Sequence, residues 1–600
     1  MALISKASLL MVPSTYEEGT LYNVLPSGNR APDSTDQNSG YDQTRADFDF
    51  DRGSNAAATR IGSDGLIKKY RENLLTESNN FSDSDWDEQN ATLTSGQVDK
   101  DGGTDAWKFE ATTTGQTYIQ QSISIAANQP TALSIYAKKG NVDFLKFIFA
   151  CSGSNSIVTF DLSDGSTSNN LRNISVNTED VGGGWFRCSA SAAPGTNITA
   201  ERFEVRSDKS DADADDGSFI YIQNAQVETG LVATDYLDSG ATTAKAGVLI
   251  DLPRINFDAN GENGSLLLEP SRQQLLQYSE YFDGSGWNKT SGGTGSTPTT
   301  TINTNETLSP EGVYNATKIV FDSGSGTTTG DLSLIEGVVS IAAGTDASTS
   351  IWLKGENGGE QLHMRGVSNG SFSIITLTTE WQQFTTSENS STTTDSLQFG
   401  IRQNVSGLGI INSNATIYAY GAQIELGSYA TSYIPNHGTS SGVTRAADRP
   451  QILNTTTDIL SQTAFTLFFE ADLTLDTTNN FMDIVAFRGS SSALRIETRT
   501  DSSVRVQQSE MITSGDSWNS ATIGDTDNKK FAITFTTSQV RLYADGSLVN
   551  TYNGAYSSDL VNILFRNSTS LGVEIKTNFK QYILFNEALT DAECVTLTTL

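Results

Sequence analysis

One sequence pattern occurs twice in this chain, and the duplication limits the fold more than any other feature. Asn73–Trp86 and Gln274–Trp287 share the same spacing of Leu-Leu, Ser, Phe and Trp. Further landmarks follow in the same order: Ala106–Phe109 with Ala316–Ile319, Ser124–Ala127 with Ser340–Ala343, Ser134–Lys138 with Ser350–Lys354, Trp185 with Trp381, and Ala225–Glu228 with Ala422–Glu425. The offset between copies changes only between landmarks, which is typical of loop insertions between fixed strands. The sequence therefore predicts a duplicated β domain.

The local patterns within the first copy favour strands over helices. Residues 119 to 125 and 133 to 137 each place apolar side chains on one face at a period of two. Asn128-Gln129-Pro130 between them is a turn signal, which predicts that the two strands pair as a hairpin. The chain has 52 Gly and only 36% hydrophobic residues, a composition that favours many short strands around thin two-layer cores.

These landmarks divide the chain into three larger modules joined by shorter segments. The predicted parts are an N-terminal attachment or oligomerisation segment at 1–72, repeat 1 at 73–238, a connector at 239–273, repeat 2 at 274–437, a linker at 438–450 and a C-terminal domain at 451–600. Residues 1–72 are too few and too polar for a large core, so we expect them to pack on a partner or on sister chains. A protease is expected to cut first in 239–273 or 438–450.

Charge and hydropathy exclude several classes of partner. The formal net charge of −32 repels a phosphate backbone or an anionic membrane surface, so nucleic acid is not an expected partner. No run of about 20 apolar residues exists, which argues against membrane insertion. The apolar residues near the N-terminus are interrupted by Lys6 and stopped by Pro13, too soon for a signal-peptide core. We therefore expect synthesis and assembly in a cytoplasm, and the 3 cysteines suggest no disulfide framework.

Three parts of the chain resemble known families. In the C-terminal domain, Val540–Val549 with its Asp545-Gly546 turn, followed by Leu589–Glu593, resembles a laminin-G-like or concanavalin A-like sandwich. The repeats resemble the carbohydrate-binding-like jelly rolls in structural proteins of tailed bacteriophages, through the motifs at Asn73–Trp86, Gln226–Tyr236 and Gln423–Tyr433. Repeat 2 departs from the pattern at Gln274, where the family has Asn. Residues 45–75 resemble the N-terminal part of the same virion proteins.

The resemblance implies an all-β fold of tandem β-sandwiches, with two jelly-roll-like repeats and a C-terminal concanavalin A-like sandwich after a small N-terminal segment. It implies a non-enzymatic virion protein, a fibre, spike or decoration, that is homotrimeric and is exposed on the particle exterior. Its partners would be other virion proteins, contacted through the N-terminal segment, and a host-surface or environmental glycan. The alternatives are a structural capsid or tail component without ligand, a glycan-depolymerising spike enzyme, and a bacterial surface adhesin.

The best sequence candidate for a glycan contact is Trp518. An aromatic ring stacks on the apolar face of a pyranose, and most other tryptophans fall on the duplicated framework, where core packing explains them. Trp518 lies in Ser514–Asn519, whose composition predicts an exposed loop. Asp516 and Asn519 would supply hydrogen bonds around the stacked ring.

A second candidate is an acidic loop in repeat 1. Asp211, Asp213 and Asp215 stand close together before Gly217, and Ca²⁺ prefers several carboxylate oxygens on a flexible loop. The spacing does not fit an EF-hand, because Ile222 stands where the bidentate Glu belongs. A solvated acidic loop is therefore the favoured interpretation, with a Ca²⁺ site as the alternative, and no other cofactor is expected.

No catalytic residue is predicted. Gly438–Gly442 matches the nucleophile-elbow string Gly-x-Ser-x-Gly and follows His437, but that elbow requires a strand before it and a helix after it. Pro435 precedes the string and the extended Val443–Arg445 follows it, so the sequence favours a linker. The only other histidine is His363, which leaves little room for histidine-dependent acid–base or zinc chemistry.

Overall fold

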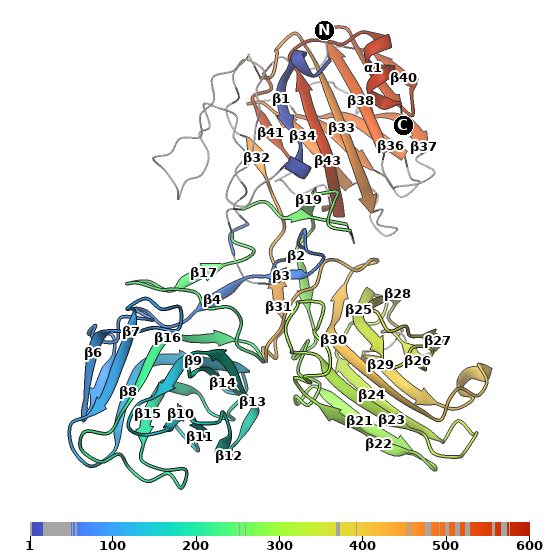
Figure 1. The fold of residues 1–600 in the computed structure, drawn as a ribbon. Helices are drawn as coiled ribbons and strands as arrows, with labels where there is room; N and C mark the ends of the chain where they lie inside the picture. The colour runs from blue at the N-terminus through green and yellow to red at the C-terminus, as the bar shows by residue number, and fades with distance from the viewer. Residues whose placement is uncertain are drawn as a thin grey trace.

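The chain folds into three β-sandwiches, two side by side and a third beyond them (Figure 1). The structure, a computed structural model, describes residues 3–15, 50, 52–54, 57–250, 252–258, 260–367, 372–391, 393–452, 455, 457, 459–474, 482–490, 493–498, 503–509, 517–522, 529–554, 559–565, 573–574 and 576–599. Within these residues, no helix is both long enough and apolar enough to cross a membrane. The all-β, tandem-sandwich prediction is confirmed.

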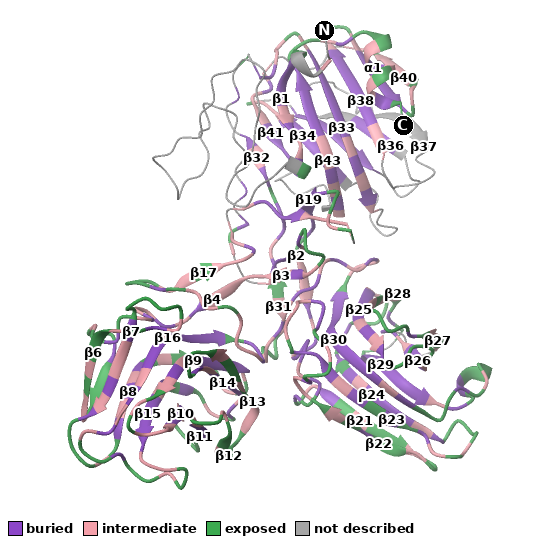
Figure 2. Cartoon of the chain, in the orientation of Figure 1, coloured by how far each residue is buried: buried purple, intermediate pink, exposed green. Residues whose placement is uncertain are grey.

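The first sandwich is built from repeat 1. One sheet has the order β12 (Thr167–Leu171), β11 (Ser156–Asp161), β10 (Phe144–Cys151), β15 (Ile198–Arg206), β8 (Thr117–Ile125) and β5 (Asp87–Gln89). The other has the order β13 (Asn173–Gly182), β14 (Trp185–Ala192), β9 (Thr131–Lys139), β16 (Phe219–Thr229), β7 (Ala106–Ala111) and β6 (Ala91–Gln97). Buried apolar side chains from both sheets form one core between them (Figure 2).

The predicted hairpin between residues 119–125 and 133–137 is wrong. These residues form β8 and β9, and the two strands belong to opposite sheets. The turn before Pro130, where Asn128 has a φ of 62°, carries the chain across the core instead of back along the same sheet. Alternation of apolar residues shows only that a strand faces a core, and both sheets of a sandwich satisfy that condition equally.

The second sandwich repeats this plan. One sheet contains β22 (Ser296–Thr301), β23 (Thr317–Asp322), β30 (Asn414–Leu426), β25 (Asp346–Gly355) and β28 (Gln382–Asn389), with β20 (Arg272–Gln274) and β31 (Val443–Arg445) beyond β30. The other has the order β21 (Trp287–Gly292), β24 (Leu332–Val339), β29 (Asp395–Arg402), β26 (Gln361–Arg365) and β27 (Ser373–Thr376). A short 3₁₀ turn, η4 (Val405–Gly407), follows β29.

Strand register relates the two sandwiches residue by residue. Phe203 on β15 pairs with Ile119 on β8, and Phe399 on β29 pairs with Ile335 on β24. Strands β15 and β29 therefore occupy the same place in the two copies. Any residue on one can be compared with its counterpart on the other.

The third sandwich holds the C-terminal residues. One sheet contains β40 (Ser547–Asn553), β39 (Gln539–Ala544), β38 (Lys529–Thr536), β33 (Ala464–Thr474) and β43 (Lys576–Phe585). The other contains β32 (Gln451–Ile452), β41 (Asn562–Leu564), β34 (Met482–Arg488), β35 (Ala493–Thr498), β36 (Ser503–Ser509), β37 (Ser517–Thr522) and the parallel β42 (Val573–Glu574). The predicted hairpin turn is confirmed, since Asp545 and Gly546 both have positive φ (49° and 70°) between β39 and β40. Helix α1 (Asp591–Thr598) ends the fold.

Strands from two distant parts of the chain complete this sandwich. The N-terminal β1 (Ala7–Met11), flanked by the 3₁₀ turns η1 (Leu3–Lys6) and η2 (Pro13–Thr15), pairs antiparallel with one half of β43. The connector strand β19 (Ser265–Leu268), itself paired with β18 (Ile255–Asn256), pairs with the other half. Figure 1 shows β1 beside β43. The expectation that this segment packs on a partner or on sister chains is therefore wrong for β1, whose apolar side chains fill a core of the same chain.

A second N-terminal element lies on the second sandwich. The hairpin of β2 (Thr59–Ile61) and β3 (Ile67–Lys69) packs its isoleucines against Tyr420 and Tyr433. Lys69 forms ion pairs with Glu280 and Glu311 at 3.0 and 2.7 Å. The following β4 (Arg71–Asn73) pairs with β17 (Ala244–Ala246) of the connector. This hairpin, too, contacts the same chain.

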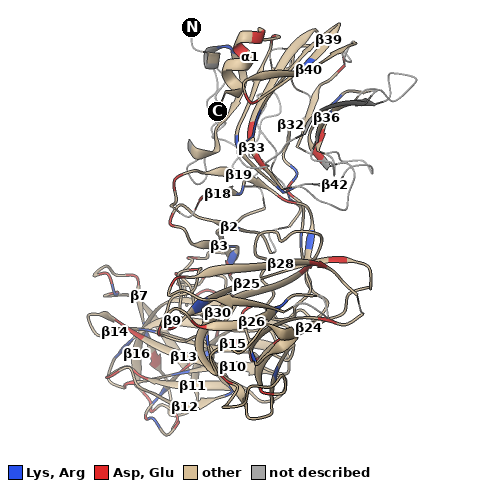
Figure 3. Cartoon of the chain, turned by 90° about the vertical axis from the view of Figure 1, so that its right-hand side faces the viewer, with Lys and Arg blue, Asp and Glu red and all other residues tan. Residues whose placement is uncertain are grey.

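The predicted connector and linker are buried in part. Arg254 and Glu269 of the connector and Arg445 and Asp448 of the linker are all buried, where they form one network of ion pairs. The expectation of first cleavage in 239–273 or 438–450 stays a prediction, since other residues of both segments, such as Ala241 and Ser441, are exposed. Figure 3 shows the charged residues that lie at the level of β2 and β3, between the third sandwich and the other two.

One charged side chain is buried in the first core without a partner. Glu201 on β15 lies on the same side of the sheet as Phe203, fully buried, and neither carboxylate oxygen has a hydrogen-bond partner among the described residues. Burial raises the pKa of Glu201 well above its usual range. The register places Leu397 at the equivalent position of the second sandwich, where it is a core residue.

We predict that Glu201→Leu stabilises the first sandwich by about 1–3 kcal/mol at pH 7, the cost of leaving a buried polar group without a partner. Since the folded pKa is raised, the native state binds a proton that the unfolded chain has released. The stability of the wild type therefore falls as pH rises above about 4.3, where an unfolded Glu titrates. Urea unfolding of the full chain from pH 4 to 8 tests both points.

The control is Glu201→Gln, which removes the charge but keeps the buried polar group. This variant is expected to lose the pH dependence while gaining less stability than Glu201→Leu. A Leu variant no more stable than the wild type at pH 7 would contradict the prediction.

Candidate functional site

The structure places Trp518 and Asn519 in a strand, so the predicted loop is wrong. Both belong to β37, at the edge of its sheet, where their backbones pair with Val506 and Arg505 of β36. The side chains of β37 and the whole of Asp516 lie outside the described residues. The Ser, Asp and Asn neighbours suggested a loop, but an edge strand tolerates polar residues because one of its sides faces solvent. The glycan contact at Trp518 stays a prediction.

The acidic loop of repeat 1 directs its carboxylates to basic side chains. Asp211 lies 2.7 Å from Lys146 and 3.2 Å from Arg206, and Asp213 also pairs with Arg206. Asp215 is exposed. Among the described residues, no group of three or more His, Cys, Asp or Glu side chains is placed to hold a metal ion. The Ca²⁺ site stays a prediction, and two of its three ligands have other partners here.

The nucleophile-elbow string lacks the structure that such an elbow needs. Gly438–Gly442 forms a turn that leads into strand β31, not into a helix. Burial lowers the pKa of the neighbouring His437. The strand after this turn agrees with the extended Val443–Arg445 that the sequence predicted.

The duplicated motif residues form an internal hydrogen-bond network in each sandwich, centred on Asn73 in the first and Gln274 in the second, which we call the polar clasp. Asn73 donates from Nδ2 to two backbone carbonyls and accepts two backbone N–H groups at Oδ1. Gln274 makes the same four bonds in the second sandwich, so the longer side chain replaces Asn without loss of a partner. The partners are Ala225, Leu237, Leu75 and Val227 for Asn73, and Ala422, Ile434, Leu276 and Ile424 for Gln274.

The remaining motif residues serve the same clasp. Glu228 accepts hydrogen bonds from the backbone and hydroxyl of Thr234, and Glu425 does the same with Thr431. Trp86 donates its indole N–H to the carbonyl of Glu77 at 3.0 Å, buried in the first core. The residues that carry the family resemblance thus hold the strand ends together, and their side chains are not available to a ligand.

The sheet that contains β15 in the first sandwich and the sheet that contains β29 in the second differ in the charged and polar side chains on their outer sides. Side chains alternate along a strand, so every second residue of β10 and β15 points away from the core. In the first sandwich these residues form what we call the first face: Tyr118, Lys146, Arg202, Glu204 and Arg206. Glu204 pairs with Arg202 and Arg206, and the guanidinium of Arg202 stacks 3.9 Å from the centre of the Tyr118 ring.

The first face is closed by its own charges. The loop at 207–216 folds over it, held by β-bridges from Asp213 to Arg206 and from Ala214 to Gly115. Lys146 and Arg206 are nearly buried beneath this loop. Since its charges are satisfied within the chain, the first face offers little to a ligand.

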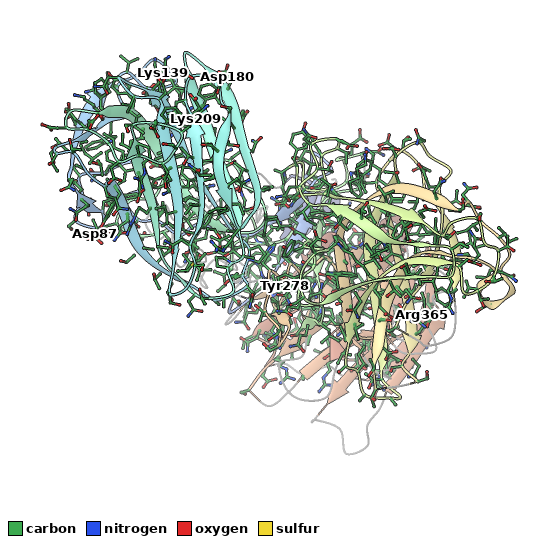
Figure 4. The ribbon with its side chains drawn as sticks, turned by 90° about the horizontal axis from the view of Figure 1, so that it is seen from below. Asp87, Lys139, Asp180, Lys209, Tyr278 and Arg365 are labelled. Atoms are coloured by element: carbon green, nitrogen blue, oxygen red, sulfur yellow. The ribbon has the colours of Figure 1, made fainter. Side chains whose placement is uncertain are left out.

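The second sandwich has a counterpart without such an acidic loop, which we call the second face: His363, Arg365, Phe372, Gln398 and Arg402. Their strand neighbours Met364, Leu397, Phe399 and Ile401 are core residues, so the four strand residues of this set lie on the opposite side of the sheet. The Phe372 ring lies against both guanidinium groups, 5.2 Å from Arg365 and 5.9 Å from Arg402. Figure 4 marks Arg365, on the second sandwich.

His363 and Gln398 each carry a buried polar atom on the second face that has no hydrogen-bond partner among the described residues. These atoms are Nε2 of His363 and Oε1 of Gln398, and both residues are more than nine-tenths buried. His363 accepts the backbone N–H of Arg402 at Nδ1, so the proton of a neutral imidazole belongs on Nε2. Burial and the nearby Arg402 lower the pKa of His363, which keeps the ring neutral. The floor of this face therefore holds one buried donor and one buried acceptor whose partners are not among the described residues.

This combination can recognise a polar ring compound. Buried polar groups are almost always satisfied in native proteins, so two unsatisfied ones on neighbouring strands of one face favour a ligand or ordered water. A hydroxyl group can accept from His363 and donate to Gln398, while Phe372 supplies an apolar surface. The sequence analysis used His363 only to argue against catalysis and missed the other four residues. The available signal was the duplication, because the second copy lacks the acidic loop that closes the first.

Comparisons with known proteins support no closer identification. No family model matches the chain, and no curated protein matches it. Solved structures match in part. One is a structure of botulinum neurotoxin type C, whose cell entry depends on interaction with two ganglioside molecules (12% identity, TM-score 0.23, 26% of this chain and 40% of that one). Another is the binding domain of Paraclostridial Mosquitocidal Protein 1 (14% identity, TM-score 0.23, 27% of this chain and 44% of that one). A third is the CBM40 domain of a Ruminococcus gnavus sialidase (11%, 0.19, 23% and 83%). The chain spans less than half the length of the first two, and TM-scores this low establish no relationship.

Proposed function

We propose that this protein is a non-enzymatic adhesion component of a tailed-phage virion, of fibre, spike or decoration type, that binds host-surface or environmental glycan. It is a homotrimer, assembles with other virion proteins and is exposed on the particle exterior. The virion assignment rests on the resemblance of the repeats and of residues 45–75 to such proteins. The glycan assignment rests on the second face.

One observation carries the glycan proposal. His363 and Gln398 hold a buried donor and acceptor without partners among the described residues, on the face where the Phe372 ring lies, while the charges of the first face pair with one another and with the loop at 207–216. A single sugar ring on such a face is held weakly, because one aromatic contact contributes only about 0.5–1.5 kcal/mol. Several copies on one particle multiply that affinity, since later contacts form at a high effective concentration.

We predict that Phe372→Ala weakens binding of the full chain to host cells about fivefold, the loss expected for one aromatic contact. The melting temperature should stay nearly unchanged, because Phe372 does not belong to the core of the second sandwich. Flow cytometry with labelled protein measures binding, before and after glycosidase treatment of the cells.

Tyr314→Ala is the matched control, since Tyr314 is an exposed aromatic elsewhere on the same sandwich. Equal binding by the wild type and Phe372→Ala would remove the second face from the proposal. Binding that survives complete removal of surface glycan would overturn the glycan assignment. Electron microscopy of virions labelled with an antibody to this chain tests the particle location.

A further inference from the structure

An arginine occupies the same place on both faces. Arg206 stands two residues after Glu204, which pairs with Tyr118, and Arg402 stands two residues after Gly400, which pairs with Leu334. Because these pairs are equivalent in the duplicated sheets, Arg206 and Arg402 are counterparts. Both lie at the end of their strand, where the chain turns into a loop.

In the first sandwich this arginine holds carboxylates. Asp211 and Asp213, from the loop that follows β15, both pair with Arg206, while Lys146 on β10 also pairs with Asp211. The equivalent of Lys146 in the second sandwich is His363, as the strand register shows. The first face is thus a carboxylate site that its own loop fills.

In the second sandwich the arginine remains and the acids are gone. Residues 403–413, which follow β29, contain no Asp or Glu. Arg402 donates Nε–H to the carbonyl of Thr329 at 3.1 Å and lies against Phe372, and no carboxylate pairs with it among the described residues. The neighbouring Arg365 differs, because Glu336 lies 3.3 Å away and neutralises it. Arg402 is therefore the cation of this face that remains available to an anion.

We propose that the second face is selective for a sugar that bears a carboxylate, and that Arg402 binds this carboxylate in the place that Asp211 and Asp213 take on the first face. The inference rests on the proposed function, since it names the class of glycan for the same site. His363 donates Nε2–H to the sugar, Gln398 accepts from a ring hydroxyl, and Phe372 covers the apolar side of the ring. A guanidinium–carboxylate contact is short and charge-assisted, so it separates acidic from neutral sugars.

Matched pairs of glycans test this selectivity on the full chain. The probes are polygalacturonate, hyaluronan and sialyllactose, each immobilised beside its carboxyl-reduced form, which differs only in that group. We expect the wild type to bind at least one acidic probe about tenfold or more above its reduced partner, as for a charged hydrogen bond. The preference should weaken as salt is raised, because the contact is partly exposed.

Arg402→Gln is expected to abolish the preference and Arg402→Lys to keep part of it, with melting temperatures measured for both. Lys209→Gln is the matched control, because it removes one positive charge from an exposed position on the first sandwich (Figure 4). Equal binding of acidic and reduced probes, or a preference that survives Arg402→Gln, would overturn the inference and leave the proposed function intact. If the wild type binds no probe of either kind, the glycan function of this face fails as well.

Discussion

Deletion of residues 2–15 is expected to unfold the third sandwich, although these residues lie more than 400 positions before it in the sequence. The deletion removes β1, whose Leu9 and Met11 are essentially fully buried in the core. Each such side chain stabilises the fold by about 1.5–3 kcal/mol. The deletion also exposes half of one edge of β43, and the backbone groups along that edge lose their hydrogen-bond partners.

The free energy lost with these side chains and backbone pairs is comparable with the whole stability of an ordinary domain, about 5–15 kcal/mol. We therefore expect the third sandwich to unfold completely, not in part. Calorimetry of the full chain should show one melting transition missing or shifted far down, with the transitions of the other two sandwiches kept. Leu9→Ala alone should destabilise the third sandwich by about 2–5 kcal/mol.

A synthetic peptide of residues 3–15 provides the sharpest control. If β1 acts as a strand of this sheet, the peptide added in excess should restore the lost transition, because it pairs with β43 without a covalent link. Leu408→Ala, at an exposed position of the second sandwich, should change nothing. A deletion variant that melts like the wild type would show that the strand is dispensable. The same reasoning predicts that residues 451–600 do not fold alone, since they lack β1, β18 and β19.

The duplication could be predicted from the sequence because its landmarks are local. The Trp86 and Trp287 motifs, the clasp residues and the core strands each need only a fixed spacing within one repeat, and spacing is visible in a sequence. The replacement of Asn73 by Gln274 in the second copy looked like a departure. The structure shows that both amides make the same bonds.

What could not be predicted depends on contacts between distant segments. The apolar residues of β1 were visible, but nothing in the segment indicates that its partner is β43. The second face could not be predicted for the same reason, because His363, Phe372 and Arg402 are spread along the chain and the pairing of β26 with β29 brings them together. The sequence predicted a connector at 239–273, but it did not show that Arg254 and Glu269 within it belong to a buried network.

The second large effect concerns that network, which joins the N-terminal hairpin, the connector, the second sandwich, the linker and the third sandwich. Arg254 donates to Glu269 at 2.9 Å and pairs with both oxygens of Asp448. It also donates to the carbonyl of Thr59 in the N-terminal hairpin and to the hydroxyl of Ser432 in the second sandwich, each at 2.9 Å. One guanidinium therefore connects the hairpin, the connector, the second sandwich and the linker.

Glu269 is the matching centre of negative charge. Arg254 and Arg445 pair with it at 2.9 and 2.8 Å, and Lys576 on β43 lies at 3.8 Å. Burial alone would raise the pKa of Glu269, but Arg445 and Arg254 hold it far below its usual range. The stability that this carboxylate contributes is therefore complete at neutral pH. It is lost as pH falls below about 4.3, where the unfolded chain takes up the proton.

We predict that Arg254→Met costs about 3–5 kcal/mol, the usual effect of removing one partner from a buried ion pair. The methionine fills similar space but leaves Asp448 without its main partner, while Glu269 loses one of its two arginines and keeps Arg445. Calorimetry measures the loss, and limited proteolysis should show new early cuts in 239–273 and 438–450. The outcome distinguishes a network that fixes the sandwiches relative to one another from charges that are merely buried.

Arg172→Met is the control, because Arg172 is exposed on the first sandwich and should cost less than about 0.5 kcal/mol. A double variant shows whether the loss of stability comes from the missing ion pairs or from the carboxylate that is left buried without a partner. If Arg254→Met with Asp448→Leu is more stable than Arg254→Met alone, the penalty came from the carboxylate left unpaired. If Arg254→Met melts and resists protease like Arg172→Met, the network does not hold the sandwiches together. Their arrangement would then depend on the strand pairing of β19 with β43 and on direct contacts such as Tyr278 with Asn128.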